Sequence, residues 1–167
     1  KKMLCSGCGS LLTIDPNTKI CCCEYCGSVY SADNDISNDA DFTINAGTLR
    51  AYCGQSPVVI VPSGVLKIGE ACFRGMSFIA SVMLPEGLRE IGMDAFEGCT
   101  RLKEILLPEG LLYIGGKAFK GTGIQTLRIP KSVHFIGDGA FQECIELTSA
   151  SLPALDRIQL KRTFKLC

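Results

Sequence analysis

The stretch Val82–Cys99, VMLPEGLREIGMDAFEGC, recurs along the chain in whole or in part. When the copies are aligned on the proline, prolines fall at positions 62, 85, 108, 130 and 153, in steps of 23, 23, 22 and 23 residues. An Ile-Gly pair follows each of the first four prolines. A phenylalanine follows every proline at one fixed distance, at positions 73, 96, 119, 141 and 164. Self-similarity at this period is typical of a solenoid in which each repeat forms one layer.

The spacing of aliphatic residues in each repeat predicts a first strand that ends at the proline. Leu102, Ile105 and Leu107 have the spacing of a strand whose aliphatic side chains point into the stack. Proline ends such a strand because it has no N–H for further pairing. The Pro-Glu-Gly sequences at 85–87 and 108–110 then predict a turn of the chain.

The second half of each repeat predicts a short strand on the opposite side and a bend. Leu88 and Ile91 supply the apolar side chains of this second strand, and Gly92 is expected to give a tight bend. Residues 94–96 predict one helical or 3-10 turn, closed by Gly98.

The phenylalanines of successive repeats should form one aromatic column through the core. Phe96 is expected to stack on Phe73 and on Phe119. A single repeat cannot bury its own apolar face, whereas four or five stacked copies share a continuous core.

These residues resemble the BspA-type leucine-rich repeats, a bacterial family with the pattern L-x-x-I-x-L-P-x-G-L-x-x-I-G-x-x-A-F-x-G-C. The resemblance covers about residues 42–167. It implies a β-rich leucine-rich-repeat solenoid with a repeat of 22–23 residues, and a binding role such as adhesion, host contact or scaffolding. The last copy departs from the pattern at Ile158-Gln159 and Thr163-Phe164.

The cysteines gather at the N-terminus, where six of the eleven lie within the first 26 residues. Cys5-x-x-Cys8-Gly and Cys23-x-x-Cys26-Gly have the spacing of two metal-binding knuckles, and four thiolates close a tetrahedral shell around one structural Zn²⁺ per chain. The residues between them predict a hairpin, 11–14 with 19–22, that turns at 15–17. Residues 3–30 therefore resemble a small zinc ribbon with four cysteine ligands, whose folding should depend on the metal.

Other interpretations of the cysteines stay open. Two disulfides or a rubredoxin-like iron site are alternatives to zinc, and Cys21 and Cys22 are left outside the metal shell. Cys99 and its equivalents in other repeats should pack as small hydrophobic residues. A ligand cluster together with unpaired thiols in the repeats favours a reducing, cytoplasmic location in a bacterium, with the cell surface or secretion as the alternative.

The composition shift along the chain predicts four segments. Residues 31–41 hold four aspartates and a single aliphatic side chain, which is typical of a solvated linker. Residues 42–44 and 48–52 flank a glycine-containing turn and predict a hairpin that caps the solenoid. The segments are 1–30 zinc ribbon, 31–41 acidic linker, 42–61 hairpin cap with the first strand, and 62–167 repeats.

Charge and chemistry restrict the function. Lys plus Arg equals Asp plus Glu at 17 each, so there is no overall basic field for nucleic acid or a membrane surface. No apolar run approaches the ~20 residues needed to span a bilayer. The single histidine, His134, has no catalytic partner, and Glu86 and Glu109 repeat only because they lie in equivalent turns. We expect no enzyme activity, no small-molecule substrate and no cofactor other than zinc.

Surface recognition remains as the predicted activity. In a strand with Leu102, Ile105 and Leu107 inward, the intervening positions point outward. These outward positions form two columns, Ile60, Met83, Leu106, Arg128, Ser151 and Val58, Ser81, Glu104, Thr126, Ser149. An exposed apolar stripe rimmed by charge is a candidate protein contact. The residues expected to bind a partner are Ile60, Met83, Leu106, Glu104 and Arg128. The alternative is that the cap, the ribbon or a second copy of the chain covers them.

The sequence thus predicts a non-enzymatic scaffold that binds an unidentified protein on the strand face of the solenoid. Two alternatives stay open: nucleic-acid binding through the zinc ribbon, and a cell-surface adhesin of the BspA type. Against the first, residues 1–30 carry only Lys1, Lys2 and Lys19 as basic side chains. Self-association through the open C-terminal repeat is a further expected contact.

Overall fold

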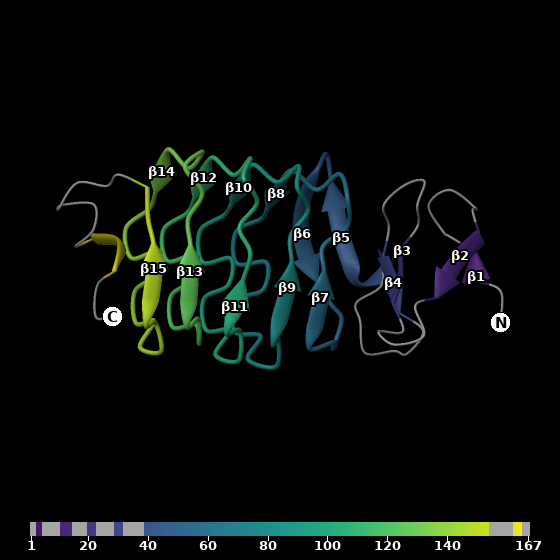
Figure 1. The fold of residues 1–167 in the computed structure, drawn as a ribbon, viewed down its shortest axis with the longest axis horizontal. Helices are drawn as coiled ribbons and strands as arrows, with labels where there is room; N and C mark the ends of the chain where they lie inside the picture. The colour runs from purple at the N-terminus through teal and green to yellow at the C-terminus, as the bar shows by residue number, and fades with distance from the viewer. Residues whose placement is uncertain are drawn as a thin grey trace.

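The structure is a computed structural model that describes residues 3–4, 11–14, 20–22, 29–31, 39–153 and 162–164. Residues 42–153 form a coiled stack of short strands and bends in which each repeat is one layer (Figure 1). The solenoid expected from the repeats is therefore confirmed.

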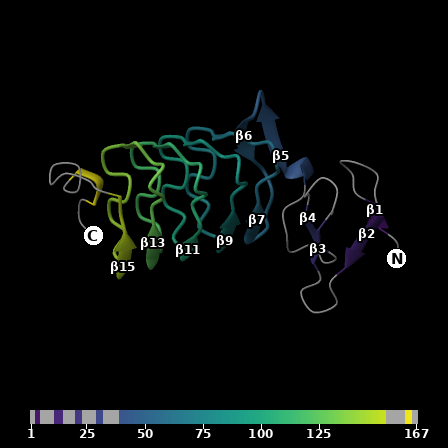
Figure 2. The same cartoon turned by 45° about the horizontal axis from the view of Figure 1, so that its top comes forward.

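The strands that precede the prolines lie side by side in repeat order along one side of the stack, here called the front row (Figures 1 and 2). Within the front row, β7 pairs with β9, β9 with β11, and β13 with β15, all in parallel. Buried residues such as Val59 and Val82 lie at the middle of these strands. The strands of the front row are β7 Val58–Ile60, β9 Ser81–Met83, β11 Glu104–Ile105, β13 Thr126–Arg128 and β15 Ser149–Ser151.

The second strand of each repeat joins a continuous six-stranded sheet, here called the back sheet, in the order β14-β12-β10-β8-β6-β5. The repeats contribute β8 Lys67–Ile68, β10 Glu90–Ile91, β12 Tyr113–Ile114 and β14 Phe135–Ile136. The predicted hairpin is present as β5 Phe42–Asn45 and β6 Thr48–Tyr52. Because β6 pairs in parallel with β8, the hairpin extends the back sheet as well as ending the stack.

The segment before the solenoid contains a four-stranded antiparallel sheet, β1-β2-β3-β4. Its strands are β1 Met3–Leu4, β2 Leu11–Ile14, β3 Ile20–Cys22 and β4 Val29–Ser31. The pairing of β2 with β3 is the expected hairpin. The 3-10 helix η1, Asp39–Asp41, then leads into β5, so regular structure reaches into both ends of the acidic stretch 31–41.

The bend around Phe96 contains single turns and pairs with the next layer. In the second repeat, the amides of Asp94, Phe96 and Gly98 donate to carbonyls of the next repeat at 3.0, 2.7 and 2.8 Å. Asp94 and Gly98 both have positive φ, 54° and 76°, which interrupts any helical run. The amides of Glu97 and Cys99 instead bond to the carbonyls of Asp94 and Phe96, each 3.1 Å away and three residues earlier, so single turns form. These turns do not continue into a helix because the alternate amides pair between layers.

The glycine of each Ile-Gly pair is required for space. A Cβ at Gly92 would lie 2.8 Å from the carbonyl carbon of Gly69, and one at Gly115 would lie 2.5 Å from that of Gly92. The layers therefore approach each other through backbone alone in this column, a role different from the expected tight bend.

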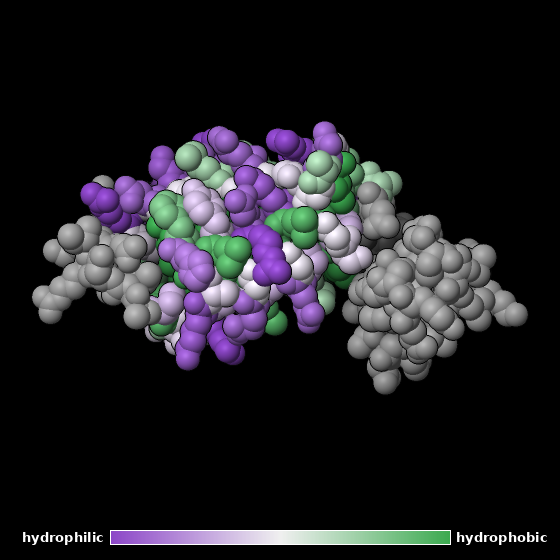
Figure 3. All heavy atoms as spheres, turned by 90° about the horizontal axis from the view of Figure 1, so that it is seen from above, coloured by the Kyte–Doolittle hydropathy of each residue, from purple (hydrophilic) through white to green (hydrophobic). Residues whose placement is uncertain are grey.

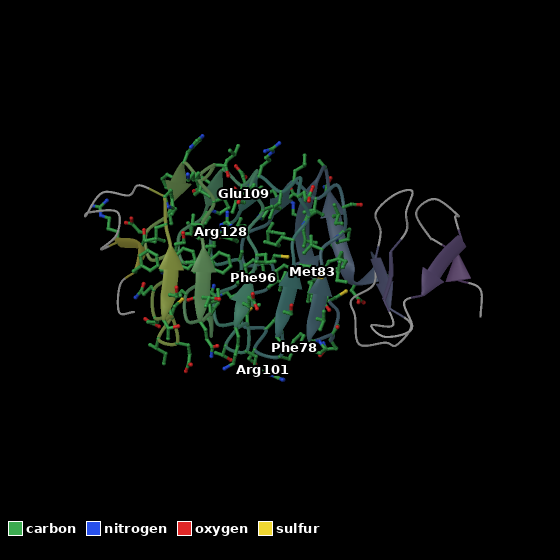
Figure 4. All side chains as sticks on the ribbon, viewed as in Figure 1. Phe78, Met83, Phe96, Arg101, Glu109 and Arg128 are labelled. Atoms are coloured by element: carbon green, nitrogen blue, oxygen red, sulfur yellow. The ribbon has the colours of Figure 1, made fainter. Side chains whose placement is uncertain are left out.

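The aromatic column is confirmed and longer than expected. Phe73, Phe96 and Phe119 stack with ring centroids 5.0 and 5.2 Å apart and ring planes within 6° of parallel. The stack continues through Phe141 to Phe164 at 5.2 and 5.4 Å. At the other end Tyr52 contacts Phe73, and Phe42 contacts Tyr52. Figure 4 shows Phe96 between the front row and the back sheet.

The front row is interrupted between β11 and β13. β11 and β13 belong to different sheets, and the backbone bond that spans this position is from Gln125 N to Lys103 O at 3.0 Å. The repeat that begins at Pro108 is the 22-residue copy, and its missing residue falls beside Gly123. A Cβ at Gly123 would collide with the carbonyl oxygen of Thr100, so the shorter corner is tightly closed.

Truncation of one ring should destabilise the whole stack. Phe96→Ala removes a fully buried side chain with a ring on either side, and we expect the free energy of unfolding to fall by about 3–5 kcal/mol. Met93→Ala, an exposed change one bend earlier, should alter it by less than about 0.5 kcal/mol. Urea denaturation followed by circular dichroism measures both; equal effects of the two variants would contradict the role of the column.

Candidate functional site

The structure places the predicted partner-binding side chains on the outward side of the front row. Met83 is 53% exposed and Leu106 is 77% exposed. Glu104 and Arg128 are exposed as well, whereas Ile60 is half-buried. The outward orientation expected from strand alternation is therefore confirmed for Met83, Leu106, Glu104 and Arg128. Figure 4 shows Met83 and Arg128 on this side.

Two shallow hollows flank Leu106. The first, about 290 Å³, is lined by backbone and side chains of 81–84 and 104–106, with Met83 and Leu106 on its two sides. The second, about 240 Å³, lies between Leu106 and Arg128 and is bordered by Thr126, Ser149 and Ser151. The large side chains that border the first hollow are thus apolar, whereas hydroxyl groups and a charge border the second. Leu106 is the ridge that separates them.

The charges of this face are few and solvent-exposed. Arg128 Nη2 lies 3.1 Å from Glu109 Oε1, and both side chains are more than two thirds exposed. A pair of this kind contributes little to stability and leaves both groups open to other partners. Glu104 lines both hollows, and within residues 39–153 no basic side chain forms an ion pair with it.

The back sheet carries a second group of exposed apolar side chains that the sequence interpretation did not select. Tyr113 and Phe135 are 38% and 49% exposed, and their rings stack on each other at 4.7 Å with planes 4° apart. Both residues lie five positions after the proline of their repeat, so the alignment of the repeats could have identified them as neighbours. The neighbouring copies have Lys67 and Glu90 there, joined as an ion pair.

A row of alternating charges follows the third side of the stack. Arg74 Nε lies 2.8 Å from Glu97 Oε2, Lys120 Nζ lies 3.4 Å from Glu97 Oε1, and Lys120 reaches Glu143 at 4.0 Å. Each acidic side chain lies next to a basic side chain of the adjacent layer, so the charges of the row compensate one another. These ion pairs hold neighbouring repeats in register. We assign it a structural role.

Seen from above, over the turns that link the front row to the back sheet, hydrophobic atoms form separate patches among hydrophilic ones (Figure 3). This edge of the solenoid therefore has no continuous apolar surface in the coloured part of the chain. The front row, with its two hollows, remains the candidate binding face.

The four cysteines within residues 39–153 are free thiols, and three of them are buried. Cys53 is exposed, whereas Cys72, Cys99 and Cys144 are buried. The Cys99 thiol donates to the carbonyl of Phe73 at 3.1 Å, and Cys144 does the same to Phe119. The expected packing of this column as small hydrophobic residues is confirmed for both. Burial raises the pKa of Cys72 and of Cys99 to about 12, against an ordinary value of 9.0.

The predicted metal ligands Cys5, Cys8, Cys23 and Cys26 lie outside the described residues, as does the part of the C-terminal repeat expected to self-associate, 154–161 and 165–167. In the part of the chain that the structure does describe, no group of three or more metal-binding side chains gathers. Nor does that part contain a helix long and apolar enough to cross a membrane.

The family model of the BspA type leucine rich repeat region matches residues 48–167 in six copies. The chain belongs to this family. The match includes β6, which supplies a partial first layer: Leu49 pairs in register with Ile68, and the Tyr52 ring contacts Phe73 with ring planes tilted by 44°.

Solved structures of leucine-rich repeat proteins share the fold. The leucine rich repeat protein of T. pallidum (TpLRR) is 27% identical, with 70% of this chain and 71% of that chain covered and a TM-score of 0.59. A leucine-rich repeat protein from Bacteroides ovatus is 28% identical over 85% of this chain, with a TM-score of 0.63, but this chain spans only 39% of its length. The pneumococcal vaccine antigen PcpA, 23% identical over 80% of this chain and 30% of its own, shows the fold alone at a TM-score of 0.59. No curated protein matches the chain.

The thiols should differ sharply in reactivity and should couple stability to pH. At pH 8, iodoacetamide should alkylate the exposed Cys53 at least about tenfold faster than Cys72 or Cys99, because the thiolate is the reactive form. Peptide mass mapping over time measures each site separately. Equal rates for Cys53 and Cys99 in the folded protein would contradict the buried column.

The sign of the pH effect follows from the raised pKa values. An unfolded thiol ionises near 9.0 and the folded one near 12, so the unfolded state loses protons first as pH rises. The stability contributed by the neutral buried thiols is fully present below pH 9 and is lost between pH 9 and pH 12.

Proposed function

We propose that this chain is a non-enzymatic scaffold that binds a protein on the front row of its solenoid. The observation that carries the proposal is the pair of exposed apolar side chains Met83 and Leu106, which border a hollow of about 290 Å³. Full burial of such a side chain is favourable by roughly 1.5–3 kcal/mol of free energy relative to exposure. A partner that covers these side chains therefore gains affinity. Exposed apolar patches rimmed by charge are typical of protein contacts.

The front row is favoured over the back sheet as the binding face. Tyr113 and Phe135 already shield one face of each other's ring by stacking at 4.7 Å. Met83 and Leu106 instead stand on either side of a hollow. The front row therefore offers both unfilled volume and uncovered apolar surface to a partner.

The N-terminal segment is proposed to be a structural zinc ribbon. β1 and β3 run in the same direction, because each pairs antiparallel with β2. The chain therefore leaves β1 at Leu4 and β3 at Cys22 toward the same end of the sheet, immediately before the two Cys-x-x-Cys knuckles. This topology supports one shared site of four thiolates, in which Zn²⁺ would stabilise the fold and leave no open coordination position. Its ligands would be Cys5, Cys8, Cys23 and Cys26.

A reducing, cytoplasmic location fits this proposal. Four thiolates that bind zinc and the exposed thiol of Cys53 are both favoured by reducing conditions. A cell-surface location would instead favour oxidation of the exposed Cys53.

A double substitution tests the binding face. Met83→Lys with Leu106→Glu should leave the fold intact, because both side chains are exposed, and should abolish capture of the partner from a bacterial lysate by the immobilised chain. Phe135→Glu on the back sheet is the matched control and should capture the partner as the unmodified chain does. Unchanged capture by the double variant, with its circular dichroism spectrum preserved, would exclude the front row.

Metal and thiol content test the ribbon and the location together. We expect one zinc per purified chain by elemental analysis, with the repeat cysteines reduced, and loss of structure in residues 1–30 on treatment with a chelator. Cys5→Ser should reduce the zinc content while the solenoid keeps its thermal unfolding transition. Metal-free protein with two disulfides among the four knuckle cysteines would overturn the zinc ribbon and favour the cell surface.

A further inference from the structure

We propose that the front row binds an amphipathic α-helix that carries a basic side chain and lies along the solenoid axis. This inference rests on the proposed function, since it names the kind of segment that the same face takes. It depends on the spacing of the layers, on the chemistry of the two hollows and on the position of Glu104.

The spacing of the layers matches a helix. Successive layers are 5.0–5.2 Å apart, as the centroids of Phe73, Phe96 and Phe119 show. A helix presents side chains on one face at each turn of about 5.4 Å, whereas an extended chain presents them every ~6.7 Å. Across two intervals, from Ile60 to Leu106, the layers advance about 10 Å. The i to i+7 rise of a helix is about 10.5 Å, and the corresponding extended segment covers ~13 Å.

The hollows provide adjacent positions for two side chains of a helix. They lie on either side of Leu106: the first spans β9 and β11, and the second begins at β11 and extends over β13 to β15. An apolar side chain of a helix fits the first hollow, because Met83 and Leu106 border it. The side chain one turn further on enters the polar hollow. Leu106 itself would then pack between the two, as a ridge does in the groove of a helix surface.

Glu104 specifies the charge of the helix. Its side chain is exposed, lines both hollows and lacks an ion pair with any basic residue of 39–153. Arg128 borders only the second hollow, and Glu109 lies 3.1 Å from it. The charge that both hollows share is therefore negative. A lysine or arginine beside the apolar side chains is complementary to it.

Synthetic peptides of about 18 residues, acetylated and amidated, test this directly. The probe has leucines at i, i+3, i+7 and lysines next to them, with alanine and glutamine elsewhere, and carries fluorescein. Three matched peptides accompany it: a scrambled order, a central proline that prevents the helix, and glutamate in place of lysine. Fluorescence anisotropy with the full chain measures each affinity.

The expected results are specific. The helical leucine-lysine probe should bind at least about tenfold more tightly than the scrambled and proline-containing forms, the effect of losing one buried leucine side chain. Leu106→Glu should weaken it about tenfold or more, and Phe135→Glu should leave it unchanged. Glu104→Lys should weaken the lysine probe severalfold and should strengthen the glutamate form.

Other outcomes overturn the inference and separate it from the proposed function. Equal or tighter binding of the proline-containing peptide would replace the helix by an extended ligand. If no peptide binds while Met83→Lys with Leu106→Glu still abolishes partner capture, the helix is wrong and the front row remains the binding face. If the double variant captures normally, the proposed function itself fails.

Discussion

The distance between layers is the constraint on which the rest of the solenoid depends. The stacked rings hold successive repeats 5.0–5.4 Å apart, close to the ~4.8 Å at which strands pair. The glycine column enforces the same distance through backbone contact, since a Cβ at Gly92 or Gly115 would meet the preceding layer within 3 Å. The phenylalanine column and the glycine column therefore act independently. Together they keep the front row and the back sheet in the same register.

This constraint explains why the binding face is built as columns. Residues at equivalent positions in successive repeats become neighbours in space, so a chemical property that recurs at one repeat position becomes a stripe on the surface. The apolar stripe of the front row ends at Arg128, where the sequence changes to polar side chains and the ladder of hydrogen bonds is interrupted. The charge row of Arg74, Glu97 and Lys120 follows the same logic with alternating sign.

Much of this architecture could be predicted from the sequence because it is periodic. The strands, the aromatic column and the outward direction of Met83 and Leu106 follow from spacing alone. The form of the bend around Phe96 could not be predicted from the spacing. It depends on amides that pair with the next layer and on the positive φ of Asp94, which no local propensity indicates. Leu49 and Tyr52 were predicted to belong to a capping hairpin. Their role as a partial layer of the stack was not predicted, because this segment lacks the proline on which the copies were aligned. The zinc ribbon stays a prediction.

The tight corner at Gly123 has a consequence for how such arrays change length. A layer can lose a residue where the bend meets the front row when a glycine at the shortened corner lets the layers approach, as Gly123 does. It cannot do so near the Ile-Gly column or the ring column, where a shift would place side chains against the backbone of the next layer. Length variation among copies is therefore confined to one corner of the coil. That corner adjoins the front row, so insertions there would reshape its hollows while the core remained intact.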